Sequence, residues 1–325
     1  MNIESLQNQT VYLEDMDGLT TTGSIDSPTR ITLSETDGDT ILSTIHYADF
    51  SGIITLDLAD ILRELVEPTI PSDEWDNYSN QVLSLSIRIA TTTWAQTYSF
   101  TLYCCSRDAE TQMTDIDQLD IPSDAGIPIT IRASGKETKL YLETADNLEE
   151  LSTETTRNGV GFAQKMIYIF GDQPLGKPFR ICAETSRGLE PLVRKSPIYR
   201  PMPGQFELYL FRNRFGALEL FPMSGTLELN PQYKFEVTKS GRNYSRSIKS
   251  EDVTLLQHSG HLTRKASLVL AQMLKDGLAY HYIDGDWRRI VIEEANISLR
   301  SSDSIHSQSF TFRYQEPIDI HKINF

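Results

Sequence analysis

Histidine pairs and carboxylate pairs are the residues of this 325-residue chain whose types and spacing could do chemistry. His258 and His261 form the sequence H-S-G-H, and two imidazoles at this spacing can bind a metal ion when a further ligand lies nearby. Ser259 and Gly260 between them are typical of a loop, and Ser259 or Thr263 is suited to capping a following helix. We therefore interpret the motif as a loop before a helix, and we expect no metal site and no cofactor.

Acidic residues are abundant, so neighbouring carboxylates occur by chance. Glu293 and Glu294 are adjacent, and Asp284 and Asp286 flank Gly285. Glycoside hydrolysis needs two carboxyl groups that face each other across a cleft about 5 to 9 Å wide, and adjacency does not supply this arrangement. The Asp284-Gly285-Asp286 stretch fits a hairpin turn better, with Gly285 at positive φ. Because no nucleophile motif appears with its partner residues either, we predict no catalytic residues.

A basic junction between two apolar runs is the candidate interaction loop. The runs are FELYLF (206–211) and ALELF (217–221), and the residues between them are Arg212, Asn213, Arg214, Phe215 and Gly216. This pattern predicts a β-hairpin in which Asn213 or Gly216 supplies left-handed backbone geometry. A tip that presents Arg212, Arg214 and Phe215 would suit docking on an acidic surface. A plain solvated turn is the alternative.

Short runs of alternating apolar and polar residues dominate the chain and predict β-strands. VLSLSIRIA (82–90) and TYSFTLY (97–103) have this pattern and predict a hairpin or meander. RITLSE (30–35) and TILSTIHYA (40–48) predict a second hairpin, with Asp37-Gly38 in a tight turn. Further strands are predicted at 127–133, 139–144, 165–170, 178–183, 206–211, 217–221, 232–238, 244–249, 278–283, 288–293 and 308–314.

Two segments have the apolar spacing of helices. The first is 57–66, which ends before Pro68, and the second is 262–276, followed by Gly277 as a C-cap. Strands far outnumber helices and no βαβ alternation appears. The sequence therefore predicts an all-β, β-dominated chain of β-sandwiches or barrels with two short helices.

Two stretches of turn-forming composition indicate domain boundaries. Residues 106–126 are polar and acidic, and 195–204 contain three prolines and a glycine, so we divide the chain near 120 and near 203. The predicted units are an N-terminal acidic β domain with one helix (1–120), a middle β domain or an extension of the first (121–203), and a C-terminal β-sandwich with one flanking helix (204–325).

Charge is divided unevenly along the chain. Residues 1–150 hold 7 Lys and Arg against 27 Asp and Glu, a net charge of −20, whereas residues 151–325 hold 23 against 18, a net charge of +5. Because the acidic half would repel a phosphate backbone, nucleic acid is disfavoured as a partner. Opposite signs would suit head-to-tail self-association or docking on a basic partner. The alternative is an acidic surface that only keeps the protein in solution.

Targeting signals and cysteines indicate the compartment. No apolar run approaches the ~20 residues that span a bilayer, so we expect no membrane segment. The N-terminus lacks the basic and apolar regions of a secretory signal. The three cysteines, Cys104, Cys105 and Cys182, are an odd number without zinc-site spacing. We therefore expect reduced thiols and synthesis in a cytoplasm.

Three stretches resemble tail and other virion proteins of phages and prophages of gut Bacteroidetes. Residues 213–216 match an N-[RK]-[FY]-G pattern that precedes an aromatic or acidic strand. ITLDLADILRELV (54–66) is similar to an early strand-to-helix segment of those proteins, and residues 285–314 resemble their closing strands. The resemblance implies a structural protein of a tail or baseplate, assembled in the bacterial cytoplasm and located in the virion. Its partners would be copies of itself and other tail proteins.

Three functions follow as hypotheses. The leading one is assembly, by a ring- or hub-forming tail protein of the distal-tail or baseplate type that is not an enzyme. The second is a carbohydrate-binding or adhesion module for a host-surface glycan, which predicts a shallow aromatic platform flanked by Asn, Asp or Arg. The third is a glycan-degrading enzyme on a β scaffold, which requires two facing carboxylates.

Overall fold

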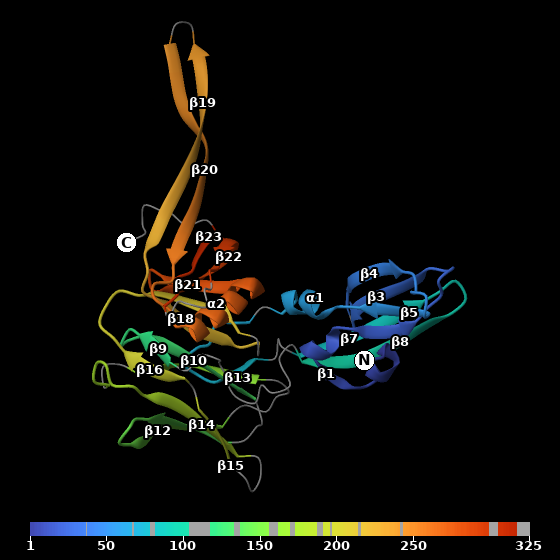
Figure 1. Ribbon diagram of the computed structural model, residues 1–325, viewed down its shortest axis with the longest axis horizontal. Helices are drawn as coiled ribbons and strands as arrows, with labels where there is room; N and C mark the ends of the chain where they lie inside the picture. The colour runs from blue at the N-terminus through green and yellow to red at the C-terminus, as the bar shows by residue number, and fades with distance from the viewer. Residues whose placement is uncertain are drawn as a thin grey trace.

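The chain folds into several β-sheets with two α-helices, which confirms the all-β prediction (Figure 1). The architecture is taken from a computed structural model. It describes residues 1–36, 38–66, 68–78, 82–103, 118–132, 137–155, 162–169, 173–186, 191–195, 197–213, 216–240, 243–298 and 305–316.

The N-terminal unit is built on a five-stranded sheet in the order β1-β8-β7-β3-β4. Its strands are β1 (Thr10–Tyr12), β3 (Thr29–Glu35), β4 (Thr40–His46), β7 (Val82–Ala90) and β8 (Ala95–Tyr103). Both predicted hairpins, β3–β4 and β7–β8, are present. Leu85, Ile87 and Ile89 are buried whereas Ser84 and Arg88 are exposed, so the alternation in the sequence does mark the core face.

Short elements complete this unit around its core. They are the 3-10 helices η1 (Ile3–Leu6) and η2 (Leu13–Met16), the paired strands β2 (Leu19–Thr22) and β5 (Ile53–Leu56), and the helix α1 (Ala59–Glu64). The helix predicted at 57–66 is therefore present but shorter.

Three smaller sheets form the middle of the molecule. The first is β10-β13-β6, with β6 (Asp76–Tyr78), β10 (Gly126–Arg132) and β13 (Phe162–Tyr168). The second is β12-β11-β14-β15, with β11 (Glu137–Glu143), β12 (Leu148–Thr155), β14 (Arg180–Ser186) and β15 (Pro191–Lys195). The third pairs β9 (Gln118–Ile121) in parallel with β16 (Ile198–Pro201), so the stretch expected to be a connector contains a strand.

The C-terminal unit is a seven-stranded sheet in the order β18-β17-β21-β22-β23-β20-β19. Its strands are β17 (Glu207–Arg212), β18 (Leu218–Met223), β19 (Leu227–Ser240), β20 (Asn243–His258), β21 (Leu278–Ile283), β22 (Asp286–Asn296) and β23 (Ser309–Tyr314). Helix α2 (Arg264–Asp276) packs against β17 and β21, and β10 packs against β18. Because both faces of this sheet are covered, every residue of β18 is buried.

α2 ends where the sequence predicts and begins at Arg264, two residues later than predicted. The Thr263 hydroxyl accepts a hydrogen bond from the backbone N–H of Ala266, which caps the first turn. Gly277 ends the helix with φ 79°, a conformation that glycine adopts without steric cost. No helix of the described residues is long and apolar enough to cross a membrane.

Two separate hydrophobic cores hold the molecule together. One belongs to the N-terminal unit, and the other runs without a break through the middle sheets and the C-terminal sheet, across the boundary expected near 203. Trp75 belongs to the second core and β6 pairs with β13, although both precede β7 in the chain. The chain therefore passes from the first core to the second and returns before the segment around 120.

Candidate functional site

The basic junction at 212–216 connects two paired strands, as the sequence predicts. β17 and β18 are antiparallel from Glu207 opposite Met223 to Arg212 opposite Leu218. Gly216 has φ 85°, which is the left-handed geometry expected of a glycine here. The side-chain oxygen of Asn213 accepts from the N–H of Ala217 at 3.1 Å, so the junction is closed on itself.

Arg212 differs from the expectation of an exposed tip, because it is buried in a contact inside the chain. Its side chain pairs with Asp276 at the end of α2, with 2.7 Å between Nε and Oδ1. Its Nη1 donates to the carbonyl oxygens of Arg63 and Val66, each at 2.8 Å. Those two carbonyls belong to the end of α1 and the turn after it. Arg212 therefore joins the last turn of α1 to the C-terminal sheet, and does not face solvent.

The neighbours of Arg212 strengthen this internal junction. Arg63 approaches Asp276 at 3.6 Å, and the hydroxyl of Tyr280 donates to the carbonyl oxygen of Pro68 at 3.0 Å. Burial raises the pKa of Asp276 above its ordinary value, although Arg212 and Arg63 both act to lower it. The carboxylate is thus costly to bury and depends on its two arginine partners.

The rest of the predicted interaction loop divides between buried and undescribed residues. Asn213 is buried and its amide donates to Glu219 at 3.2 Å. Arg214 and Phe215 lie outside the described residues, as do Cys104, Cys105 and the Asp37 of the predicted tight turn.

The H-S-G-H motif ends β20 and leads into α2, as predicted. His258 lies 3.7 Å from Glu228 on the neighbouring strand, and Thr263 caps the helix. Among the described residues, no group of three or more His, Cys, Asp and Glu side chains could hold a metal ion. The D-G-D stretch is the predicted hairpin turn between β21 and β22, with Gly285 at φ 84°. Cys182 is buried and in no disulfide, and its thiol donates to Glu143 at 3.6 Å.

An extended hairpin is a further candidate site, which sequence reasoning did not single out. β19 and β20 pair from Leu227 opposite Gln257 to Ser240 opposite Asn243. β20 pairs with β23 only from Leu255 to His258 among the described residues. Beyond that base, the two strands leave the sheet together and project from the molecule (Figure 1). We call residues 231–250 the arm, which extends roughly 30 Å at the rise of a β-strand.

One face of the arm carries exposed apolar side chains. Tyr233, Phe235 and Val237 alternate along β19 and are 40%, 42% and 62% exposed. The rings of Tyr233 and Phe235 lie 6.2 Å apart, as expected for neighbours on one face. Tyr244 across the hairpin is 68% exposed.

Basic groups lie among these aromatic rings. The guanidinium carbon of Arg246 is 3.2 Å from the centroid of the Phe235 ring, and Lys239 Nζ is 5.5 Å from that of Tyr244. The arm as a whole contains five Lys and Arg residues and one Glu, so it is basic. We call Tyr233, Phe235, Val237, Tyr244, Lys239 and Arg246 the arm face.

The N-terminal unit carries exposed apolar residues beside an open sheet edge. β4 is the edge strand of its sheet, and Ile45 in that strand is 58% exposed. Tyr47 is 61% exposed and Phe50, in the loop before β5, is fully exposed. We call this the β4 surface. Residues 1–100 hold 3 Lys and Arg against 16 Asp and Glu, so this surface belongs to an acidic part of the chain.

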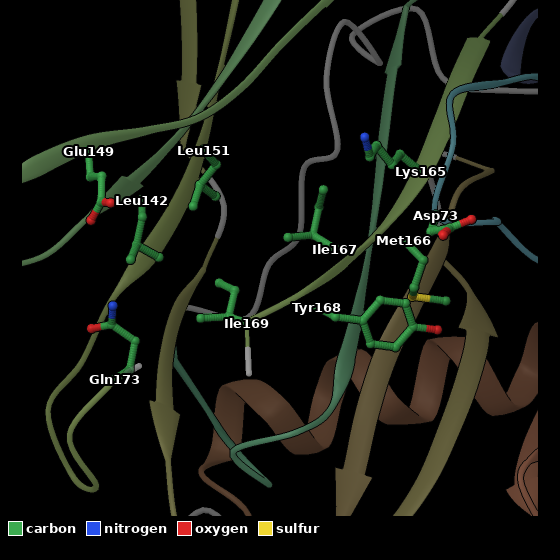
Figure 2. A pocket seen from close by; sticks show the side chains of 10 residues that line it. All are labelled: Asp73, Leu142, Glu149, Leu151, Lys165, Met166, Ile167, Tyr168, Ile169 and Gln173. Carbon is green, nitrogen blue, oxygen red and sulfur yellow. The ribbon is translucent and has the colours of Figure 1, made fainter. Parts of the chain in front are cut away.

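A cavity of about 580 Å³ lies between β13 and the β12-β11-β14-β15 sheet (Figure 2). Ile167 of β13 and Ile169 directly after the strand extend toward Leu142 and Leu151, whereas Tyr168 extends to the other side. Its charged lining residues are Asp73, Glu149 and Lys165. We assign no chemistry to this cavity.

Comparison with known proteins gives no family. No family model matches the chain, and no curated protein matches it. One partly similar solved structure is Escherichia coli alpha-2-macroglobulin activated by porcine elastase, at 10% identity and a TM-score of 0.23, over 96% of this chain and 30% of that chain. Another is a chimeric titin Z1Z2-Z1Z2 tandem with a fibronectin GRGDS peptide, at 12% identity and a TM-score of 0.17, over 61% and 95%. This chain thus spans less than a third of the macroglobulin's length. At such TM-scores neither likeness identifies a shared fold.

Proposed function

We propose that this protein is a structural assembly subunit, ring- or hub-forming, of a phage or prophage tail. The observation that carries the proposal is the arm, a two-stranded projection with an exposed aromatic and basic face. The resemblance of three stretches to virion proteins supports the tail as the assembly, with the virion as its location.

The physical argument starts from the stability of the arm. A two-stranded hairpin in water is at best marginally stable unless a further surface packs on it. A contiguous exposed apolar patch marks an interaction site. Burying one aromatic or aliphatic side chain of the arm face would contribute about 1.5 to 3 kcal/mol. The arm face is therefore suited to binding a second protein surface.

The β4 surface of a neighbouring copy is the partner that best complements the arm. It offers an open strand edge, exposed apolar side chains at Ile45, Tyr47 and Phe50, and an acidic surrounding for the basic arm. The arm of one copy would then meet the β4 surface of the next copy, head to tail. Such contacts close into a ring where the rotation between copies permits it, and otherwise form a filament.

A complementation experiment tests this pairing. Phe235→Asp disables the arm and leaves the β4 surface intact, while Phe50→Asp does the reverse. We expect each variant alone to sediment as a monomer at low salt, because every contact needs one surface of each kind. An equimolar mixture should sediment as a one-to-one dimer, since it contains one intact pair of surfaces. Leu175→Asp, an exposed residue outside both surfaces, is the matched control and should assemble like the wild type.

Two results would contradict the proposal. One is a wild-type protein that stays monomeric at every concentration, which removes self-assembly. The other is a mixture of the two variants that stays monomeric while the control assembles, which removes the pairing of arm and β4 surface.

A further inference from the structure

A second cavity, of about 410 Å³, opens between the middle sheets and the C-terminal sheet. It is bounded by the segment before β10, the end of β13, the start of β17 and the turn between β21 and β22. All its lining residues lie in the described part of the chain, and none belongs to the arm. Its volume falls in the range of about 300 to 1,000 Å³ typical of small-molecule sites.

Aromatic side chains form much of the cavity wall. They are Tyr168, Phe206, Tyr282 and Trp287. Tyr168 and Tyr282 are 45% and 41% exposed, so parts of their rings are open to solvent. The rings of Tyr282 and Trp287 lie 5.0 Å apart at 54°, which gives two faces of different orientation. Tyr168 reaches this cavity because it alternates with Ile167 and Ile169, which point to the other side of β13 (Figure 2).

Hydrogen-bonding groups lie beside the aromatic wall. Asp124 and Gln205 line the cavity from exposed positions. Glu207 lines it as well, and its carboxylate is held by His281 Nε2 at 2.9 Å. His281 is fully buried, and its Nδ1 lies 2.6 Å from the hydroxyl of Tyr314. His281 pairs with Tyr209 and therefore lies on the opposite face of the sheet from Tyr282 and Trp287, so the carboxylate of Glu207 is turned away from the aromatic wall.

We propose that this cavity binds a neutral sugar, one to two rings of a glycan. The aromatic faces would stack on the apolar C–H face of a pyranose ring. Asp124 and Gln205 would accept hydrogen bonds from its hydroxyl groups. A largely apolar wall with a few placed polar groups is the usual composition of a ligand site.

The charge of the lining decides against other ligand classes. No Lys, Arg or His is among its described lining residues, whereas the carboxylate of Asp124 is, so a uronate, a sialic acid or a phosphate would be repelled. A small quaternary ammonium group would suit an aromatic cage. Asp124 would attract such a cation, so the choice of the sugar rests on Gln205, whose amide can bond to sugar hydroxyls but finds no partner on a quaternary ammonium.

Binding of neutral trisaccharides to the full-length chain tests the assignment. The probes are cellotriose, maltotriose and N,N′,N″-triacetylchitotriose, measured by saturation-transfer NMR and titration calorimetry. We expect at least one probe to bind the wild type, and we expect Trp287→Ala and Gln205→Ala to weaken that binding at least tenfold. Gln205 is exposed and precedes β17, so its substitution tests the site without disturbing the fold. Trp94→Ala is the matched control and should bind like the wild type, because Trp94 is another partly exposed tryptophan and lies in the distant turn between β7 and β8.

Three results would overturn the proposal. They are the absence of binding by all three probes, equal weakening by Trp94→Ala, and displacement of a bound probe by choline, which would assign the site to a cation. The arm and the β4 surface contribute no residue to this cavity. A negative result here therefore leaves the self-assembly proposal untouched, and a failure of self-assembly leaves the sugar site untouched.

Discussion

Arg212 shows how one side chain can hold two parts of the molecule in contact. It lies in the C-terminal sheet, pairs with Asp276 of α2 and donates to two carbonyl oxygens at the end of α1. Unpaired carbonyls at a helix C-terminus need donors, and an arginine fork can serve several at once. The contact thus joins the hydrophobic core of the N-terminal unit to that of the rest of the chain.

Removing the charge of Asp276 should destabilise the protein strongly. In Asp276→Asn, Arg212 would remain buried without its counter-ion, which typically costs about 3 to 5 kcal/mol. Urea unfolding followed by circular dichroism measures this change. Arg63→Ala is the matched control: its side chain is 37% exposed and 3.6 Å from the same carboxylate, so we expect a loss of about 1 kcal/mol or less. Equal losses for both variants would show that Arg212 is not the main partner.

Two buried tyrosines predict a loss of stability in alkali. Burial raises the pKa of Tyr209 well above 10, with Glu207 and Tyr314 adding to the shift, and burial likewise raises that of Tyr314. In the unfolded chain a tyrosine ionises near pH 10, so above about that pH the unfolded state releases protons that the folded state keeps. The free energy of unfolding should therefore fall as pH rises above about 10, by up to about 1.4 kcal/mol per pH unit for each residue.

Tyr314→Phe provides the test of that slope. The variant should lose stability less steeply above about pH 10 than the wild type, since one of the two groups no longer titrates. Unfolding in urea at a series of alkaline pH values measures both slopes. Identical slopes would contradict a raised pKa at Tyr314.

At the scale of single residues, the sequence predicts local roles and misses distant ones. Thr263, Gly277, Gly216 and Gly285 have the predicted roles because caps and turns depend on a few neighbouring residues. The role of Arg212 could not be predicted, because its partners lie far away in the chain and periodicity does not reveal them.

Among the elements, the base of the arm depends on a close approach of two glycines. A Cβ at Gly225 would lie 2.2 Å from the carbonyl oxygen of His258 and 2.6 Å from the backbone nitrogen of Gly260. Only hydrogen fits at this position without movement of the backbone.

Gly225→Ala should therefore destabilise the C-terminal unit. We expect a loss of about 1 to 3 kcal/mol, the usual cost of overpacking, or more if the backbone of β20 must shift. Gly285→Ala is a matched control with positive φ but no atom within 4 Å of the added Cβ, so it should cost only about 1 kcal/mol. Thermal unfolding of the two variants gives the comparison. A smaller loss for Gly225→Ala than for Gly285→Ala would contradict the close approach.

The arm is the element in which sequence and structure differ most. The alternation in 232–238 and 244–249 correctly predicts two strands, but they continue to lengths of 14 and 16 residues. Nothing in the period-two pattern says whether a hairpin lies within a sheet or leaves it. The sequence does show that Tyr233, Phe235 and Val237 alternate with Lys234 and Glu236. The structure adds that β20 is the strand that pairs with this part of β19 among the described residues.

At the scale of the whole molecule, the structure has two hydrophobic cores and two exposed apolar surfaces, the arm face and the β4 surface. The sequence predicts the fold class and most strands, because alternation is a local property. It does not predict that the chain enters the second core at Trp75 and returns to the first sheet, since strand order is set by contacts between distant segments. The uneven charge is visible in the sequence, and the structure adds the surfaces on which it could act.

The mass of the purified protein in solution tests the central claim most directly. Light scattering after size exclusion, at low and at high salt, measures it without any variant. We predict a discrete oligomer at low salt that dissociates as salt is raised, because screening weakens attraction between the basic arm and the acidic N-terminal unit. A monomer at every salt and protein concentration would contradict assembly through these two surfaces.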